Sequence, residues 1–314
     1  RQTYSEVDGG PYGPVLFGKT SQDLLRANYL YRQLAFHEAI PYYEKAAPLA
    51  NDPVVFSELG DCYRYTKAMD QAAVWYKKAV VMRDCPAIVN LHYGQTLMTL
   101  QQYGEAAHWL EVYQKSVPDE KRVSNLLESC KTAEGLVSQV PSGTVSLLSF
   151  NTDGSDFGPT LRKGELLFRS DPLHRSADAG ARKSVNEWSG HNYYNMYRVS
   201  CYGNGNCNNT IKKVADRVNT KFHDGPSVFS SDGKTMYFTR THFNEQFLSR
   251  GSVPDPNGTV HLQIMVAKGY NDAAGTFESI DPFAYNSKKY STAHPAISPS
   301  GKTLVFSSDM PGGK

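Results

Sequence analysis

The chain has 314 residues and five cysteines, and its 33 Lys and Arg against 31 Asp and Glu give a formal net charge of +2. This length suggests two domains with room for buried cores. The near-balanced charge argues against a nucleic-acid partner, because such proteins normally carry a strongly basic surface. No stretch approaches the roughly 18 consecutive apolar residues that a membrane-spanning helix needs.

A repeat with a period of 33 to 34 residues occupies the first part of the chain. In the first helix of each repeat, one position carries a small residue: Ala27, Gly60 and Gly94. In the second helix, an alanine recurs at Ala39, Ala72 and Ala106, and a bulky residue follows four positions later at Tyr43, Tyr76 and Leu110. A small residue lets the two helices of a hairpin approach closely, and the bulky residue fills the gap between neighbouring hairpins. The pattern is typical of tetratricopeptide (TPR) repeats, which must stack because one hairpin cannot bury its apolar face alone.

The domain boundaries follow from this repeat. We expect an extended N-terminal lead over residues 1–19, TPR repeats with a capping helix over 20–138, and a strand-rich domain over 139–314. The capping helix is expected at residues 119–136, where apolar side chains occupy one side and charged ones the others.

A TPR stack presents its first helices along one face, which is the expected protein-binding groove. Counting from the small residues, this face carries Asn28, Tyr31, Arg32, Asp61, Arg64, Tyr65, Gln95, Met98 and Thr99. Arg, Tyr and Asn suit a peptide or protein segment through planar hydrogen bonding and stacking. A face that is merely solvated remains the alternative.

Short alternating runs rich in β-branched and aromatic residues follow Gly143, and they indicate strands. They too repeat, with Pro159, Pro226 and Pro295 spaced 67 and 69 residues apart. Each unit reads as a strand, a tight turn and a second strand. Asp232-Gly233 and Ser300-Gly301 supply the positive φ that such turns need.

A third strand follows in the first two units, at residues 195–200 and 262–267. One sheet of about four strands per repeat is the pattern of a β-propeller blade. The predicted fold class is therefore α + β multidomain, with an N-terminal TPR solenoid and a partial β-propeller. About three repeats are visible, which is too few to close a ring, so we expect the propeller to continue beyond the chain.

Residues 219–239 (NTKFHDGPSVFSSDGKTMYFT) and 290–314 (YSTAHPAISPSGKTLVFSSDMPGGK) carry a resemblance to a known family. With the preceding repeats, the chain resembles the Bacteroidota envelope proteins that combine TPRs, a WD40-like (TolB-related) propeller and an OmpA-like peptidoglycan-binding domain. The first unit departs from the pattern, with Arg162-Lys163-Gly164 in place of the Ser-Pro-Asp-Gly-Lys turn.

This resemblance implies a periplasmic, outer-membrane-associated scaffold, with a lipid anchor as an option. Its TPR groove and propeller rim would bind envelope proteins, such as an outer-membrane β-barrel or the machinery of type IX secretion or gliding. A C-terminal OmpA-like domain outside this chain would attach it to peptidoglycan. The alternative function is a TolB-like sensor or glycan-handling module of an envelope enzyme or nutrient-uptake system.

No catalytic motif, phosphate-binding loop or dinucleotide fingerprint is present, so we expect no enzyme activity and no cofactor. The nine histidines are scattered, and we expect no metal site. Asn151-Thr-Asp-Gly-Ser-Asp156 resembles an oxygen-rich calcium loop but lacks the trailing Glu, which favours a turn held by side-chain hydrogen bonds.

The cysteines fall into two groups. Cys201 and Cys207 are close enough in sequence to form a disulfide in an oxidising compartment, and metal binding by this pair alone is disfavoured because two further ligands are missing. Cys62, Cys85 and Cys130 are expected in helices as free thiols.

Overall fold

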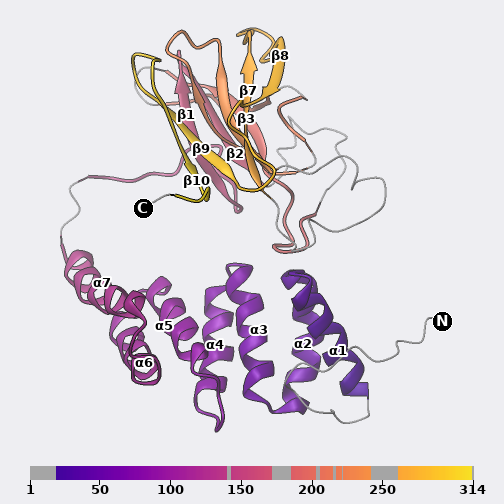
Figure 1. Cartoon of the computed structure of the whole chain (residues 1–314), viewed down its shortest axis with the longest axis vertical. Helices are drawn as coiled ribbons and strands as arrows, with labels where there is room; N and C mark the ends of the chain where they lie inside the picture. Colours follow the sequence, from indigo (N-terminus) through magenta and orange to yellow (C-terminus); the bar gives the residue numbers. More distant parts are fainter. Residues whose placement is uncertain are drawn as a thin grey trace. The chain divides into compact units, whose positions relative to one another are not determined.

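A computed structural model describes residues 19–139, 143–171, 185–202, 206–214, 217–220, 222–241 and 261–312. Its contacts divide the chain into a helical unit and a strand unit, and each is described by itself (Figure 1). The predicted N-terminal lead lies outside the described residues except for Lys19, which begins the first helix.

The helical unit consists of helices that pack in chain order. Their bounds are α1 Lys19–Arg32, α2 Phe36–Ala50, α3 Pro53–Tyr65, α4 Met69–Val80, α5 Ile88–Thr99, α6 Tyr103–Ser116 and α7 Lys121–Val137. The closest packing joins α1 with α2, α3 with α4 and α5 with α6, and α7 follows on α6. Three helical hairpins and a final helix are the arrangement of a TPR-like repeat region.

The small first-helix residues have the predicted role. A Cβ added at Gly60 would lie 2.7 Å from the ring of Tyr76, and one at Gly94 would lie 2.8 Å from Leu110. Both contacts are closer than packed carbon atoms tolerate. Tyr76 and Leu110 are fully buried, so the glycines allow the second helix of each hairpin to press its bulky side chain against the first.

All three hairpins share one turn geometry that the sequence did not reveal. Leu34, Lys67 and Gln101 each have a left-handed backbone, with φ of 60°, 69° and 60°. In each turn the next residue donates its N–H to a carbonyl five positions earlier, as in Ala68 to Tyr63 at 2.9 Å. This is the Schellman arrangement that satisfies the last carbonyls of a helix.

The described residues of the strand unit form three antiparallel sheets. The first comprises β1 Asp156–Arg162, β2 Glu165–Ser170, β3 Asn195–Ser200 and β4 Lys212–Lys213; the second, β5 Asp224–Phe229, β6 Met236–Thr241, β7 Leu262–Lys268 and β8 Ser279–Pro282; the third, β9 Thr292–Ile297 and β10 Leu304–Ser308. In the first two, the strands lie in chain order. The predicted turn glycines Gly233 and Gly301 have φ of 71° and 70°, which confirms both turns.

The inner strands β2 and β3 of the first sheet have buried side chains on both faces. Because successive side chains in a strand point to opposite faces, Leu167 joins an apolar core with Phe238 of the second sheet, whereas Phe168 joins a separate core with Phe150 and Ile211. The second sheet in turn meets the third, where Thr239 Oγ1 accepts the N–H of His294 at 2.9 Å.

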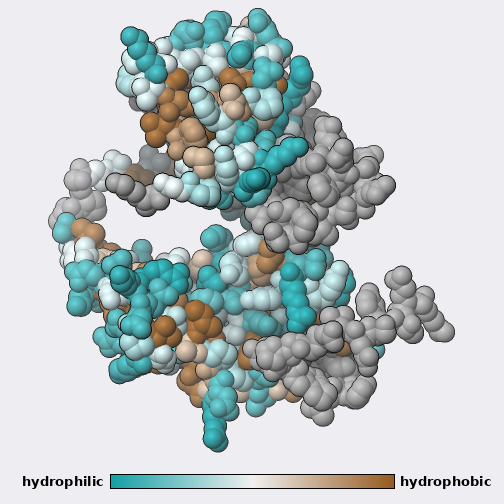
Figure 2. Space-filling model, viewed as in Figure 1, coloured by the Kyte–Doolittle hydropathy of each residue, from teal (hydrophilic) through white to brown (hydrophobic). Residues whose placement is uncertain are grey.

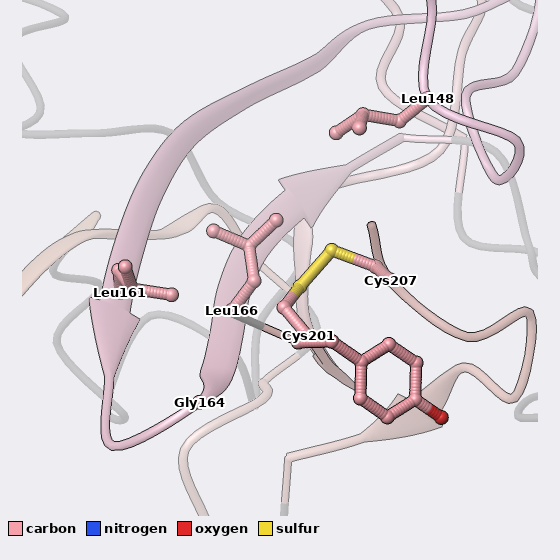
Figure 3. A pocket seen from close by; sticks show the side chains of 7 residues that line it. Leu148, Leu161, Gly164, Leu166, Cys201 and Cys207 are labelled. Atoms are coloured by element: carbon pink, nitrogen blue, oxygen red, sulfur yellow. A yellow bond between two sulfur atoms is a disulfide. The ribbon is translucent and has the colours of Figure 1, made fainter. Parts of the chain in front are cut away.

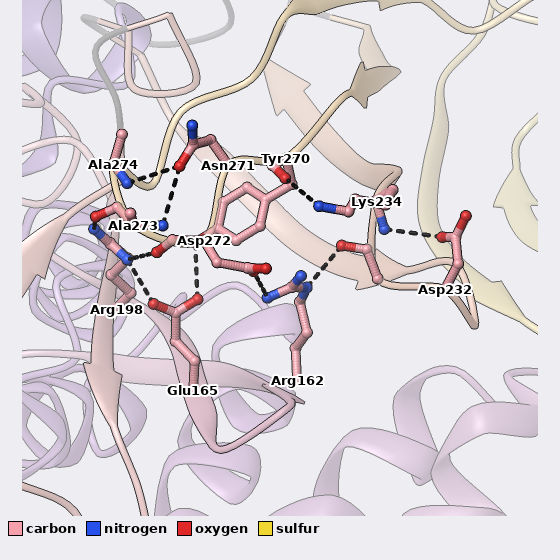
Figure 4. A network of polar contacts seen from close by, with 11 residues as sticks. Arg162, Glu165, Arg198, Asp232, Lys234, Tyr270, Asn271, Asp272, Ala273 and Ala274 are labelled. Atoms are coloured by element: carbon pink, nitrogen blue, oxygen red, sulfur yellow. Dashed lines mark hydrogen bonds and ion pairs between the residues drawn. The ribbon is translucent and has the colours of Figure 1, made fainter.

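A polar network joins the first two sheets at the β1–β2 turn (Figure 4). Arg162 donates from Nε to the carbonyl of Gly233 at 2.7 Å and pairs with Asp272 at 2.5 Å. Tyr270 donates to Glu165 at 2.8 Å, and Arg198 pairs with the same carboxylate at 2.7 Å. The guanidinium of Arg162 also lies 4.6 Å from the ring centre of Tyr270.

The predicted meanders are therefore present, but the described residues do not close into a propeller ring. Among these residues, no helix has the length and apolar character to span a bilayer. Figure 2 shows hydrophilic residues over much of the visible surface, interrupted by small apolar patches.

Candidate protein-binding face of the helical unit

The candidate site is the first-helix face, which we define as the side chains predicted above on α1, α3 and α5. Asp61, at the middle of α3, is its centre and is only 7% exposed. Its carboxylate accepts hydrogen bonds from the hydroxyls of Tyr31 at 3.0 Å and Tyr76 at 2.6 Å. Arg64 Nη2 and His92 Nδ1 lie at 3.0 Å from the same carboxylate. One buried charge thus links three hairpins.

A second, half-buried acid lies about one helical turn earlier. Glu58 accepts a hydrogen bond from the hydroxyl of Tyr43 at 2.9 Å, and the same hydroxyl lies 2.9 Å from Asn28 Oδ1. Tyr43 is fully buried. Asn28 on α1 therefore contacts Tyr43 on α2, and its side-chain oxygen already has a partner within the repeat.

The two acids respond oppositely to their surroundings. Burial raises the pKa of Glu58, and the hydrogen bond from Tyr43 only partly opposes it. Burial also disfavours ionised Asp61, but the contacts with His92, Tyr76 and Arg64 outweigh it and hold the pKa of Asp61 below its usual value. Asp61 is therefore a permanent negative charge at neutral pH.

The predicted residues divide into those committed to the fold and those still accessible. Tyr31 and Asp61 bond to each other, and Met98 packs against the helical core. Tyr65 stacks on Phe36, with centroids 4.4 Å apart, and lies under the guanidinium of Arg64. Arg32 is exposed and Gln95 is half-buried. Arg64 and His92 keep 19% and 23% of their side chains exposed.

Sequence reasoning missed Glu58, Tyr76 and His92 as members of this site. Tyr76 was recognised as a packing residue of the second helix, but the destination of its hydroxyl depends on which helices touch. His92 lies two residues before Gly94, a position without a repeated residue type. A search for acids and hydroxyl-bearing aromatics near the small first-helix residues would have found Glu58 and Tyr76.

The sulfur atoms of Cys201 and Cys207 are joined in a disulfide in the strand unit. Beside it lies a pocket of about 430 Å³ (Figure 3), lined by the side chains of Leu148, Leu161 and Leu166. Cys62 and Cys130 are buried free thiols in helices. The expectation that Cys85 is helical is wrong, because it lies between α4 and α5 next to Pro86, which disfavours helix at the preceding residue.

The acidic segment 151–156 is a turn. Asp156 Oδ2 accepts from the backbone N–H of Thr152 at 2.6 Å and from its hydroxyl at 2.8 Å. The same pattern recurs between Thr220 and Asp224 at 2.7 and 2.8 Å. It is thus a repeated structural device of the strand unit. Within the described ranges, no cluster of His, Cys, Asp and Glu has an arrangement that would hold a metal ion.

Comparison with known protein families finds no match, and comparison with curated proteins finds none either. Solved structures do show similarity. The Yersinia enterocolitica type III secretion chaperone SycD, in complex with a peptide of the translocator YopD, is 22% identical, covers 36% of this chain and 93% of its own, and gives a TM-score of 0.33.

Two further similar structures are TPR-type proteins as well. MamA from Desulfovibrio magneticus is 19% identical over 39% of this chain and 70% of its own, with a TM-score of 0.36. The first TPR of Spaghetti (RPAP3), bound to an HSP90 peptide, is 21% identical over 37% of this chain and 94% of its own, with a TM-score of 0.34. The TPR-like assignment itself rests on the repeat period, the hairpins and the turns described above.

Proposed function

We propose that this protein is a non-enzymatic scaffold that binds other proteins through the first-helix face. The network around Asp61 is the observation that carries this proposal. Its bonds to Tyr31, Tyr76, Arg64 and His92 fix polar side chains on three successive first helices. Binding of a partner at the accessible edges of Arg64 and His92 costs little side-chain entropy in this protein, because both side chains are already held in place.

Site-specific photocrosslinking in the native cell tests this function. A photoreactive amino acid is placed at Arg32 or Gln95 on the first-helix face. Matched controls carry it at Lys45 on α2 or Lys77 on α4, which are exposed second-helix positions. We expect a discrete crosslinked partner from Arg32 and Gln95 and none from the controls. Equal crosslinking from both sets, or crosslinking from the controls alone, would contradict the assignment of this face.

We also propose that the protein works in the periplasm, in association with the outer membrane. The Cys201–Cys207 disulfide supports this location, because disulfides persist in oxidising compartments and are rare in the cytosol. Peptide mapping of the native protein without reducing agent, after trapping free thiols, is the direct test. Recovery of Cys201 and Cys207 as alkylated thiols would rule the proposal out.

At the finer level, we propose that the sheets are blades of a β-propeller and that the protein links a type IX secretion or gliding complex to peptidoglycan. The support is the pair of four-stranded meanders in chain order and the resemblance of the chain to the envelope family described above, which includes PorE. The peptidoglycan contact would be made by an OmpA-like domain outside this chain.

The sequence of the complete gene product distinguishes this role from the alternative. An OmpA-like domain after the strand repeats supports the scaffold. A hydrolase domain in that place favours the sensor or glycan-handling module, and it would make the whole protein part of an enzyme. A pull-down of peptidoglycan fragments by the full-length protein, and by a version truncated after Lys314, then tests the attachment directly.

A further inference from the structure

Arg169, in strand β2, is a buried cation without a counter-ion among the described residues. It is only 4% exposed, and no ion pair or hydrogen bond joins its guanidinium to the described part of the chain. Its Nε lies fully buried without an acceptor. Burial lowers the pKa of Arg169 to about 10, so the group is still charged at neutral pH. An unpaired buried charge is costly, which makes this position unusual.

Two glycines leave the space that the Arg169 side chain occupies. Gly158 of β1 and Gly225 of β5 both have positive φ, at 62° and 102°, and a Cβ at either one would collide with the Arg169 side chain. The ring of Phe157 lies beneath the guanidinium, with its centroid 4.2 Å from Cζ. Phe157 is 40% exposed, so the ring that borders the guanidinium lies at the surface. Stacking on an aromatic ring uses the face of a guanidinium and provides no hydrogen-bond acceptor for its N–H groups.

The second sheet contains the same position with its charge neutralised. In the antiparallel register, Phe157 of β1 lies opposite Arg169 of β2. Asp224 of β5 lies opposite Arg240 of β6 in the same way. Arg240 Nε donates to Asp224 at 2.6 Å. At the position opposite the arginine, the first sheet therefore has an aromatic ring where the second has a carboxylate. Asp156, one residue earlier, keeps the turn with Thr152 but lies opposite Ser170 and not Arg169. The two sheets act as an internal comparison for one cross-strand pair.

Neighbouring groups do not replace that carboxylate. Asp171, two residues after Arg169, accepts the N–H of Ser155 at 2.9 Å and contacts His191 at 2.8 Å. His223 Nδ1 accepts the backbone N–H of Tyr194 at 3.2 Å. Burial, more than the nearby charges, lowers the pKa of His223 to about 4, so this ring is neutral at physiological pH. Among the described residues, the positive charge of Arg169 therefore has no matching negative charge.

We propose that the cradle formed by Arg169, Gly158, Gly225 and Phe157 binds a carboxylate group. The missing partner in the first sheet is chemically the carboxylate that Asp224 supplies in the second. A planar carboxylate matches the guanidinium fork and carries the single negative charge that the described residues around Arg169 do not supply. The ligand is either a small carboxylate or the carboxylate of an acidic protein segment. This site is independent of the first-helix face.

NMR spectroscopy of the arginine Nε–H groups in the full chain tests the proposal. Sodium acetate is titrated against sodium chloride at constant ionic strength and constant pH. We expect a saturable shift of the Arg169 signal with acetate, and little change of the Arg240 signal, because Asp224 already occupies that guanidinium. An equal response to chloride, an equal shift of Arg240, or no response of Arg169 would overturn the proposal.

Two variants at Phe157 sharpen the test without removing Arg169. Phe157→Asp gives the first sheet the internal counter-ion of the second, so acetate should bind at least tenfold more weakly. Phe157→Leu removes the ring without adding charge, and it should retain the acetate response within a few-fold. The Arg169→Gln variant identifies the Nε–H signal of Arg169, because that signal is absent from its spectrum. Acetate binding by Phe157→Asp as tight as by the wild type would overturn the site, provided that the spectrum shows a folded protein.

Further probes distinguish the source of the carboxylate. The peptide acetyl-Gly-Gly-Glu-Gly-Gly-amide is compared with the same peptide carrying Gln in place of Glu. Tighter binding of the Glu peptide than of acetate identifies a protein segment, whereas equal or weaker binding identifies a small carboxylate. Both results support the shared chemistry. Tighter binding of inorganic phosphate than of either carboxylate would overturn the assignment to a carboxylate.

Discussion

Asp61 is the residue on which the polar contacts of the helical unit converge. Its carboxylate is buried and accepts hydrogen bonds from side chains on α1, α3 and α4, with His92 of α5 alongside. Hydrogen bonds to an ionised group are stronger than neutral ones, and the loss of the charge leaves several donors poorly matched. Asp61 therefore stabilises the repeat while it positions the accessible residues of the first-helix face.

Asp61→Asn should lower the free energy of unfolding at pH 7 by about 2–3 kcal/mol, because the amide is a weaker acceptor and leaves Arg64 unpaired. Urea unfolding followed by circular dichroism at 222 nm measures this change. Asp70→Asn is a matched control, since Asp70 is exposed in the first turn of α4. A loss no larger than that of the control would show that the network contributes little.

The pH dependence of stability should differ in sign between Asp61 and Glu58. The pKa of Asp61 is lowered on folding, so its contribution is present above the unfolded pKa of about 3.9 and is lost as pH falls through the folded pKa. The pKa of Glu58 is raised, so its contribution is present below the unfolded pKa of about 4.3 and is lost as pH rises through the folded pKa.

The measurement is a set of urea titrations from pH 3 to pH 7 on the wild type, Asp61→Asn and Glu58→Gln. The stability difference between the wild type and Asp61→Asn should grow as pH rises from acid. The difference between the wild type and Glu58→Gln should change in the opposite direction over the range above pH 4. Parallel curves for the two variants would refute the assigned pKa directions.

At the scale of the elements, the three hairpin turns share a left-handed residue that is not glycine. Leu34, Lys67 and Gln101 occupy this position at spacings of 33 and 34 residues. A residue with a Cβ pays a steric cost in this conformation, and glycine does not. The turn was invisible to sequence analysis because none of the three residue types is characteristic of it.

Gln101→Gly should raise the free energy of unfolding by about 0.5–1 kcal/mol, because relief of the steric cost exceeds the added backbone entropy of the unfolded chain. Chemical unfolding of the variant measures the gain. Gln101→Ala serves as the control, because alanine removes the same exposed side chain but keeps the Cβ. An equal gain in both variants would place the effect in the side chain and not in the turn.

The strands, by contrast, were predicted closely from the sequence. Alternating apolar residues and the Asp-Gly and Ser-Gly turns specify hairpins locally, and Gly233 and Gly301 have the expected positive φ. The short outer strands β4 and β8 were not located, because Lys212–Lys213 and Ser279–Pro282 carry no alternating pattern. They form because a neighbouring strand offers unpaired backbone groups.

At the scale of the whole molecule, the repeats of the strand unit are joined by buried polar contacts as well as by apolar packing. Tyr270 crosses from the second sheet to Glu165 of the first, 105 residues away in the chain. Its ring also contacts Arg162 and Phe229. Loss of the hydroxyl alone should therefore weaken the junction of the sheets while the ring packing remains.

Tyr270→Phe should lower the free energy of unfolding by about 1.5–3 kcal/mol, the range for a hydrogen bond to a charged group. Hydrogen exchange should quicken together in the β1–β2 turn and in residues 270–274. Tyr237→Phe is the control, because Tyr237 lies in the same sheet and its hydroxyl has no hydrogen bond within the described part of the chain. Similar losses in the two variants would exclude a role for the Tyr270–Glu165 contact.

The sequence by itself determined the two kinds of repeat, their periods and the glycine turns of the strand hairpins, because helical spacing, strand alternation and glycine conformations act between residues that are close in the chain. It also placed Tyr31, Asp61 and Arg64 on one face. Only the tertiary structure decided that Tyr76 and His92 complete that cluster. It also decided that Arg169, unlike Arg240, has no counter-ion in the part of the chain that the structure describes. Charges and hydrogen-bonding groups pair according to distance in space, and the packing of successive hairpins and sheets sets those distances.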